Sequence, residues 1–299
     1  MLPAVMAEAA RRFGDAPALI APDGTRTSFA ELHRRSDAAA AGLRRAGIGR
    51  GDVVGVTLPT CAEYVVTYVG AAKLGAITAG VNPRLADAER ARMLEVAKPA
   101  LVVTSVDDVG ALEDHGDPAP PPLEGDIDRP VAIVFTSGTT GVPKGAVFSN
   151  RQLQAIVDID TGGAWGGGST SIASTSLAHV GFMTKLPWYL MSGGARCLLD
   201  KWEAEASLRL LAEHRMTNVG GVPTQVALML RAPTFDDYDL SCVTTIVLGG
   251  GPAPVPQPPV SVDENRTDTG ALKRALASRC SGTGAGPPPR TIEVTQERS

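Results

Sequence analysis

The sequence predicts an α/β fold with two packed, mostly parallel sheets flanked by helices. Short apolar runs rich in β-branched residues alternate along the chain with segments of helical spacing. The turns between them carry glycine, proline or helix-capping residues. The chain has 299 residues, 43% of them hydrophobic, which is enough to bury a substantial core. Because strands separated by helices usually connect in parallel, this alternation predicts parallel sheets covered on both faces.

The alternation begins near the N-terminus. A small hairpin at 17–27 turns at Pro22–Gly24, and a capping pattern at Ser28 starts a helix that runs to Arg45. A second capping pattern, Thr60 to Glu63, precedes another helix, which Gly75 ends. The elements expected next are strands at 53–58, 77–81 and 100–104 and helices at 64–74 and 86–97.

The second half continues the pattern after a strand at 131–135, a short strand at 145–148 and a helix capped at Ser149. Further strands are expected at 171–174, 195–199, 219–222 and 243–248, and further helices at 181–191, 202–214 and 224–230.

Two segments differ in composition from these elements. Residues 107–130 are acidic, carry several prolines and have few large apolar side chains, so we expect a surface linker. Five prolines fall between Pro252 and Pro259, and no aromatic residue follows Tyr238. The sequence therefore predicts one folded domain over residues 1–254, with the linker inside it, and a largely disordered tail over residues 255–299.

The residues from Thr136 to Gly145 are the best candidate for a functional site. A buried strand ends abruptly there in glycines, hydroxyl side chains and a lysine, a composition suited to a polyphosphate. In the P-loop of nucleotide triphosphatases the lysine follows the second glycine and precedes Ser or Thr, whereas here Lys144 precedes Gly145. This loop is therefore not a P-loop of that kind. Two short flanking strands predict the tip of a hairpin, and a flexible surface turn is the alternative. The residues expected to bind phosphate are Thr136, Ser137, Gly138, Thr139, Thr140, Gly141 and Lys144.

The composition argues against several classes of protein and site. The net charge is −4, and the basic residues form no sustained run, which argues against nucleic-acid binding. No apolar stretch is long enough to span a bilayer, and the first residues lack the order of a signal peptide, so a cytoplasmic location is expected. The four cysteines lie far apart, which favours reduced thiols over a metal site or disulfides.

The ten residues Thr136–Gly145 closely resemble the signature loop of the adenylate-forming superfamily, which includes acyl-CoA synthetases, luciferases and peptide-synthetase adenylation domains. Segments 176–181, 220–224 and 248–254 resemble, in order, three further segments of that superfamily. The resemblance implies catalytic roles for Thr136 and Lys144. It implies nucleotide contacts by the loop and by Gly249, Gly250, Gly251 and Pro252, and an acyl pocket near His179, Gly221, Val222 and Pro223.

The activity that the resemblance implies is ATP-dependent activation of a carboxylic acid to an acyl-adenylate, followed by transfer to coenzyme A. It implies Mg²⁺ as well. Peptide-synthetase domains place an aspartate near the His179 segment, whereas no acidic residue occurs here between Thr161 and Leu199. A simple carboxylic acid is therefore expected rather than an amino acid. Asn150 stands where the superfamily often has histidine.

Three features of the superfamily are not identifiable after Val255: the glutamate that helps to bind Mg²⁺, the aspartate that holds the ribose, and the small mobile domain with its lysine. We therefore expect an incomplete large N-terminal domain without the small C-terminal domain, arising from a frameshift or truncation. The sequence leaves two functions open. The chain is an impaired acyl-CoA synthetase, or it is a non-catalytic remnant with at most weak nucleotide binding.

Overall fold

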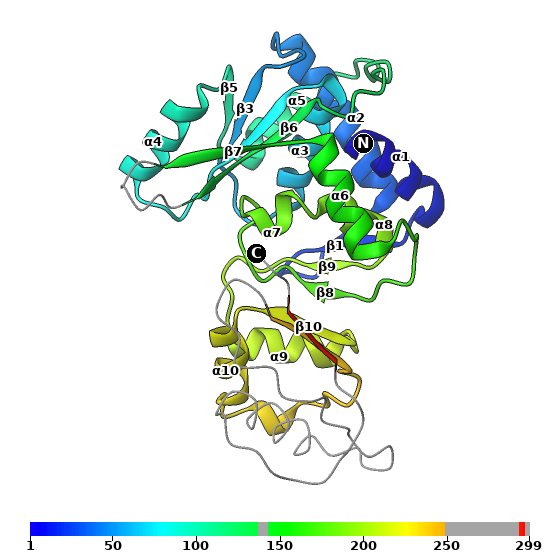
Figure 1. Cartoon of the computed structure of the whole chain (residues 1–299), viewed down its shortest axis with the longest axis vertical. Coiled ribbons are helices and arrows are strands. Elements are labelled where there is room, and N and C mark those ends of the chain that lie inside the picture. The colour runs from blue at the N-terminus through cyan, green and yellow to red at the C-terminus, as the bar shows by residue number, and fades with distance from the viewer. Residues whose placement is uncertain (137–142, 249–292, 297–299) are drawn as a thin grey trace. The chain divides into compact units, whose positions relative to one another are not determined.

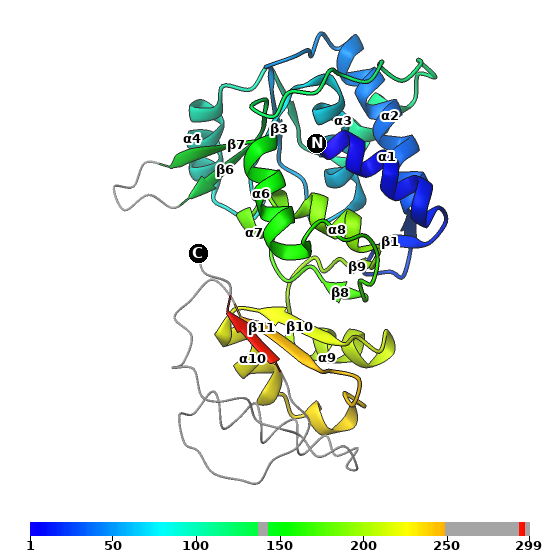
Figure 2. The same cartoon turned by 45° about the vertical axis from the view of Figure 1, so that its right-hand side comes forward.

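The computed structural model describes residues 1–136, 143–248 and 293–296 (Figures 1 and 2). The chain divides into two compact units. The first comprises residues 1–168 and 175–200, and the second comprises residues 169–174 and 201–299.

A five-stranded sheet organises the described part of the first unit, in the order β5-β3-β4-β6-β7. Its first four strands pair in parallel, whereas β7 pairs antiparallel with β6 and forms the edge. Figure 1 shows β6 and β7 running side by side toward α4. The strands are β3 (Val53–Val56), β4 (Ile77–Gly80), β5 (Leu101–Val103), β6 (Pro130–Thr136) and β7 (Lys144–Ser149).

Helices of small residues pack closely beside this sheet. A Cβ atom on Gly70 of α3 would lie 3.2 Å from the Ser36 carbonyl oxygen and from the Ala39 Cβ of α2, so α2 and α3 approach closely. Figures 1 and 2 both show α1, α2 and α3 next to one another. The helices up to residue 113 are α1 (Leu2–Phe13), α2 (Phe29–Arg45), α3 (Ala62–Leu74), α4 (Asp87–Ala97) and α5 (Val106–Glu113).

In a smaller sheet, strands from the N-terminal part of the first unit pair with a strand from its C-terminal part. Strand β1 (Pro17–Ile20) pairs antiparallel with β2 (Arg26–Ser28) and parallel with β9 (Arg196–Cys197). The remaining helices of this unit are α6 (Asn150–Thr161), α7 (Val180–Met183) and α8 (Leu186–Ser192).

The second unit is built on three parallel strands, in the order β10-β11-β12. They are β10 (Asn218–Gly221), β11 (Thr245–Leu248) and β12 (Glu293–Gln296). The same unit contains β8 (Ser171–Ile172), α9 (Ala204–Glu213), α10 (Pro223–Leu230) and a 3₁₀ turn at Phe235–Asp237.

The predicted α/β class is confirmed, together with the parallel connection of β3, β4 and β6. The sheets differ in detail from the prediction: the described strands form three sheets rather than two, and two of the three are mixed or contain a hairpin. The capping predicted at Ser28 is confirmed, since its Oγ accepts a hydrogen bond from the Glu31 N–H at 3.1 Å. Gly75 ends α3 with φ of 73°, as predicted.

The expected linker is wrong in its first part, because α5 occupies Val106–Glu113. Ser105 caps this helix through a hydrogen bond from the Asp108 N–H, and the two aspartates of the first turn complement the helix dipole. Val109 is fully buried. A Cβ on Gly42 of α2 would lie 2.1 Å from the Leu112 carbonyl oxygen, so α5 docks directly on α2. The acidic residues Asp107 and Asp108 therefore belong to the first turn of a helix rather than to a linker.

Three smaller expectations are also corrected. Helix α3 begins at Ala62 with Cys61 as its N-cap, so Thr60 is not the cap. The single helix expected at 181–191 is two helices, since α7 ends at Met183 and Pro187 lies in the first turn of α8. Within the expected disordered tail, Glu293–Gln296 forms β12. The rest of that tail lies outside the described residues, and the domain boundary at residue 254 stays a prediction.

Candidate functional site

The base of the predicted phosphate loop is an antiparallel strand pair. The β6–β7 ladder runs from Pro130, opposite Ser149, to Thr136, opposite Lys144. Thr136 and Lys144 are therefore facing residues at the last described step of the ladder, and both are exposed. The hairpin predicted from the sequence is present. Ser137, Gly138, Thr139, Thr140 and Gly141 lie outside the described residues.

Gly145 allows the two strands to approach closely at the open end of this ladder. It lies opposite Phe135, and a Cβ on it would lie 2.8 Å from Ile133 Cγ2 and 3.4 Å from Phe135 Cε1. An aromatic side chain that covers a cross-strand glycine also helps to fix the register of the pair. This packing holds Thr136 and Lys144 opposite each other.

Lys144 is available to an incoming anion. Within the described part of the chain it forms no ion pair, and its side chain is exposed. An ammonium group on a flexible stem is a point charge that can follow phosphate oxygens. Thr136 adds a hydroxyl group across the ladder, so the described part of the hairpin offers one positive charge and one hydroxyl donor.

The His179 segment lies at the same end of the sheet. Helix α7 packs against β6. A Cβ on Gly80, the last residue of β4, would lie 3.1 Å from the Ala178 Cα, and Gly80 is paired with Val134 of β6. Because β4 and β6 are parallel, their carboxyl ends lie at the same end of the sheet, and the loop departs from that end. The structure thus brings the His179 segment and the base of the loop to the carboxyl end of the parallel strands β4 and β6.

His179 is the N-cap residue of α7. Its Nδ1 accepts a hydrogen bond from the Gly181 N–H at 3.1 Å, which requires Nδ1 to be unprotonated. Although the side chain reaches the surface, desolvation by neighbouring protein atoms lowers the pKa of His179 below its usual value of 6.5. The neutral imidazole therefore carries its proton on Nε2 and can donate it to an acceptor.

The residues Gly221, Val222 and Pro223 form the turn between β10 and α10 in the second unit. The Val222 N–H donates to Gln225 Oε1 at 3.0 Å, and Gln225 Nε2 donates to the Ser174 carbonyl at 3.1 Å. A Cβ on Gly221 would lie 2.7 Å from Gln225 Oε1, so a larger residue would push this oxygen out of its capping position. Sequence reasoning missed Gln225, although it stands at the third residue of the helix, the usual place for a capping glutamine.

The fourth predicted segment, Gly249, Gly250, Gly251 and Pro252, lies outside the described residues. Strand β11 ends at Leu248, directly before it. The contact expected between these glycines and a nucleotide stays a prediction.

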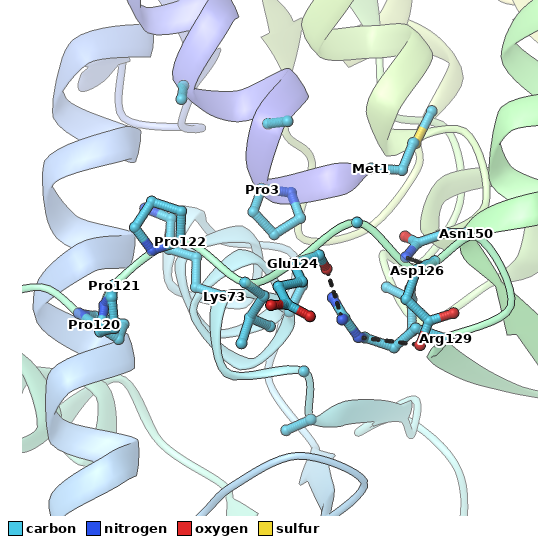
Figure 3. Close-up of a pocket in the computed structure, with 18 of the residues that line it drawn as sticks. Met1, Pro3, Lys73, Pro120, Pro121, Pro122, Glu124, Asp126, Arg129 and Asn150 are labelled. Carbon is cyan, nitrogen blue, oxygen red and sulfur yellow. Dashed lines mark hydrogen bonds and ion pairs between the residues drawn. The ribbon is translucent and has the colours of Figure 1, made fainter.

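A separate cavity of about 280 Å³ lies at the other end of the five-stranded sheet, where β4 and β6 begin (Figure 3). It is lined by Ala76 before β4, by Pro130 and Val131 at the start of β6, and by the Pro120–Asp126 segment. Strand β6 has seven residues, so at about 3.3 Å per residue its ends lie roughly 20 Å apart. This cavity is therefore remote from the loop.

The charged groups around this cavity are engaged with one another. Lys73, whose side chain is 8% exposed, donates to Ser36 Oγ at 2.8 Å and to Asp37 Oδ1 at 2.6 Å. Asn150 Nδ2 donates to the Asp126 carbonyl at 2.8 Å. Asn150, which stands where the superfamily often has histidine, thus holds the end of the Pro120–Asp126 segment at the end of the sheet away from the loop. These contacts indicate structural roles.

The described residues contain no group of three histidine, cysteine, aspartate or glutamate side chains placed to hold a metal ion. No helix in the described ranges is long and apolar enough to cross a membrane. Cys61 is a free thiol, and burial raises its pKa to about 12, so its thiolate is strongly disfavoured.

Comparison with known proteins decides the family. The family model described as "AMP-binding enzyme" matches residues 6–258. The chain belongs to the AMP-binding enzyme family. Its members are adenylate-forming enzymes, which confirms the resemblance drawn from the loop.

Several relatives of this AMP-binding chain are plant 4-coumarate–CoA ligases. Ligase 1 of Solanum tuberosum is 27% identical over 274 residues, which cover 80% of this chain and 50% of the relative. Ligase 3 of Oryza sativa subsp. japonica is 30% identical over 272 residues, covering 80% of this chain and 49% of the relative. The AMP-binding chain thus spans about half the length of the curated relatives it matches.

Solved structures of acyl-CoA synthetases share the fold of this chain. The N-terminal domain of FACL13 from Mycobacterium tuberculosis superposes with a TM-score of 0.77 at 22% identity, covering 100% of this chain and 75% of that one. A fatty acyl CoA synthetase from the same organism gives a TM-score of 0.73 at 22% identity, covering 85% of this chain and 55% of that one. The architecture is that of an adenylate-forming N-terminal domain.

Proposed function

We propose that this chain is the N-terminal part of an acid–thiol ligase that uses ATP to activate a simple carboxylic acid as an acyl-adenylate and then passes the acyl group to coenzyme A. The family membership supports adenylate formation. The thioester step and the identity of the acid rest on the relatives, which are named as coumarate and fatty-acid ligases.

The observation that carries the proposal is the structure of the strand pair at the base of the loop Thr136–Gly145. The loop departs from facing residues of a strand pair, with an exposed lysine and an exposed threonine at its two ends. Both ends are fixed by the close packing of Phe135, Ile133 and Gly145. A rigid base keeps the two described donors, on Thr136 and Lys144, near each other, which lowers the entropic cost when an anion binds.

The role proposed for the loop is to bind the diphosphate that leaves when a carboxylate attacks the α-phosphate of ATP. Negative charge grows on the leaving group in that step, and pre-placed donors then stabilise it more than they stabilise the ground state. Loss of one such donor typically costs about 3–4 kcal/mol of barrier. Lys144 supplies charge, and Thr136 supplies a hydroxyl group.

Magnesium would share this charge in the complete reaction. The described residues do not present a carboxylate cluster for it, and the usual glutamate ligand was not identifiable in the sequence. We therefore assign no residue of this chain to the metal.

The acid would bind near His179. The neutral imidazole presents the Nε2–H as a donor while Nδ1 is engaged by the Gly181 N–H. A neutral donor can orient a carboxylate without forming an ion pair that would lower its nucleophilicity. The absence of an acidic residue between Thr161 and Leu199 disfavours an amino-acid substrate, whose ammonium group would lack a partner.

The test is acid-dependent exchange of labelled pyrophosphate into ATP, which reports the first half-reaction alone. A panel would contain 4-coumarate, other aromatic acids and fatty acids of graded length, with amino acids as negative controls. Exchange that depends on one acid and falls with Lys144→Ala supports the proposal. Lys201→Ala is the matched control, because Lys201 is 74% exposed and lies in the other unit.

A non-catalytic remnant predicts a different result. It would show no acid-dependent exchange with any member of the panel, whether or not ATP binds. That outcome would reject the ligase for this chain and leave the family membership unaffected.

A further inference from the structure

Gly80 occupies a position without room for any side chain. A Cβ on it would lie 2.4 Å from Tyr64 Oη, 2.6 Å from Met183 Sδ and 3.1 Å from Ala178 Cα. Its φ lies outside the positive range that favours glycine, so the backbone there would accept other residues. Space, rather than conformation, requires glycine at this position.

The three atoms that crowd Gly80 differ in how easily they can move. Met183 Sδ belongs to a flexible thioether that can change rotamer. Tyr64 is a rigid ring that is fully buried, and Ala178 Cα is backbone. An added methyl group must therefore displace either the Tyr64 ring or the chain at Ala178, which immediately precedes His179.

The second tyrosine of α3 holds the other end of α7. Tyr68 lies one helical turn after Tyr64, is also fully buried, and donates from Oη to the Met183 carbonyl at 3.0 Å. Met183 is the last residue of α7, whereas His179 is its N-cap. Helix α7 is thus held at its end by a hydrogen bond and at its start by contact with Gly80.

Tyr64 itself carries an unexplained polar group. Its hydroxyl is buried and finds no hydrogen-bond partner among the described residues. Leaving a buried hydroxyl unpaired is unfavourable, so phenylalanine would satisfy the local hydrogen bonding better. What the hydroxyl oxygen does supply is volume, at the point where β4, α3 and α7 meet.

We propose that Gly80 is a positioning residue for His179: the close contact of Gly80 with Tyr64, Met183 and Ala178, together with the Tyr68–Met183 hydrogen bond, fixes α7 and so the direction of the His179 imidazole. We call these four residues and Gly80 the α7 seat. The seat is a property of the first unit. Its effect on catalysis rests on the function proposed above.

The first test is Gly80→Ala, read by NMR of the His179 imidazole. The protein has four histidines, so the His179 signals are assigned with a His179→Asn variant. We expect the signals to shift, and the Met183 and Thr184 amides, which donate to the His179 and Val180 carbonyls, to exchange faster. His179 signals identical to those of the wild type in a folded Gly80→Ala protein would overturn the proposal.

A matched control separates positioning from general strain in the sheet. Gly55 lies in the neighbouring strand β3, and a Cβ on it would lie 3.0 Å from Leu94 Cδ2 and 3.4 Å from Pro99. Gly55→Ala therefore strains the same sheet without touching α7. It should leave the His179 signals unchanged, and an equal shift in both variants would count against the seat.

A double variant makes the test specific and guards against a Gly80→Ala protein that does not fold. Tyr64→Phe removes the atom nearest to the added methyl group and gives up no hydrogen bond. Gly80→Ala with Tyr64→Phe should recover folding and most of the wild-type His179 signal. Failure of Tyr64→Phe to restore either would overturn the mechanism.

Kinetics supply the functional readout. In the pyrophosphate exchange assay, Gly80→Ala should raise the KM for the acid by about tenfold or more, since a misplacement of about 1 Å can cost up to about 100-fold. The KM for ATP should stay within about twofold of wild type, since a change of that size is only a few tenths of a kcal/mol. Equal rises in both KM values would contradict positioning of His179. If the wild type shows no exchange at all, the proposed function fails, and the NMR arms still decide the seat.

Discussion

Gly145 lies directly opposite Phe135 across the β6–β7 ladder, one step before the facing pair Thr136 and Lys144. The aromatic ring and Ile133 occupy the space that a side chain at position 145 would need. The conformation of the strand pair at its open end, and hence the spacing of the two ends of the phosphate loop, depends on this contact.

Gly145→Ala should destabilise the protein by about 1–3 kcal/mol, the usual cost of one extra methyl group in a packed position. Its Cβ would lie 2.8 Å from Ile133 Cγ2, an atom of a β-branched side chain that cannot easily rotate away. Urea denaturation measures the free energy of unfolding. Gly110→Ala is the control, because nothing lies within 4 Å of its Cβ, and it should be neutral or stabilising. Equal stability of Gly145→Ala and wild type would show that the ladder has room to adjust.

His179 should make the stability of the protein depend on pH. Desolvation lowers its folded pKa below the unfolded value of 6.5, so the unfolded state binds a proton first as the pH falls. The stability that neutral His179 contributes is therefore present above pH 6.5 and is lost as the pH falls through the folded pKa. Protonation of Nδ1 would also remove the acceptor for the Gly181 N–H.

The measurement is the free energy of unfolding at a series of pH values from about 7 to about 5, around the unfolded pKa. His179→Asn is the control, since asparagine can cap a helix and does not titrate. The variant should lose less stability than wild type over this range. Parallel curves for the two proteins would exclude a role for His179 in the pH dependence.

Arg35 of α2 should be essential for holding α5 against α2 and α3. It bonds Glu63 of α3 and Glu113 of α5, each at 2.9 Å, and its side chain is 17% exposed. Burial alone would raise the pKa of Glu63, but the hydrogen bond and charge of Arg35 outweigh it and hold the pKa below its ordinary value.

Arg35→Met should cost about 2–3 kcal/mol, because it leaves two partly buried carboxylates without their partner. Arg45→Met is the matched control: Arg45 pairs with Asp117 at the surface, where an ion pair contributes about 0–1 kcal/mol. Thermal denaturation of the two variants compares them directly. A cost for Arg35→Met no larger than that for Arg45→Met would contradict the role assigned to this network.

The sequence predicted those features that local chemistry determines. The cap at Ser28, the left-handed glycine at Gly75 and the hairpin around the loop follow from residues close together in the chain, and the structure has them. The start of α5 is local in the same sense, since Ser105 and Asp108 form its capping pair, but the linker at 107–130 was expected from its acidic, proline-bearing composition alone.

Other features depend on contacts between distant segments. The space around Gly80 is set by Tyr64 and Met183, which lie far from it in the chain, so a strand glycine could signal only that something approaches closely. Asn150 followed the loop in sequence, yet the antiparallel return of β7 carries it to the other end of the sheet. Neither relationship can be derived from periodicity or spacing.

The central claim is that the loop between Thr136 and Lys144 binds the phosphates of ATP, and direct calorimetric titration with Mg²⁺ and ATP tests it. The account predicts that the wild type binds ATP, that Lys144→Ala binds it about tenfold or more weakly, equivalent to the loss of one charge-assisted hydrogen bond of about 1.5–3 kcal/mol, and that Lys201→Ala binds like the wild type. Equal affinity of the wild type and Lys144→Ala, or no binding by the wild type at millimolar ATP, would contradict it.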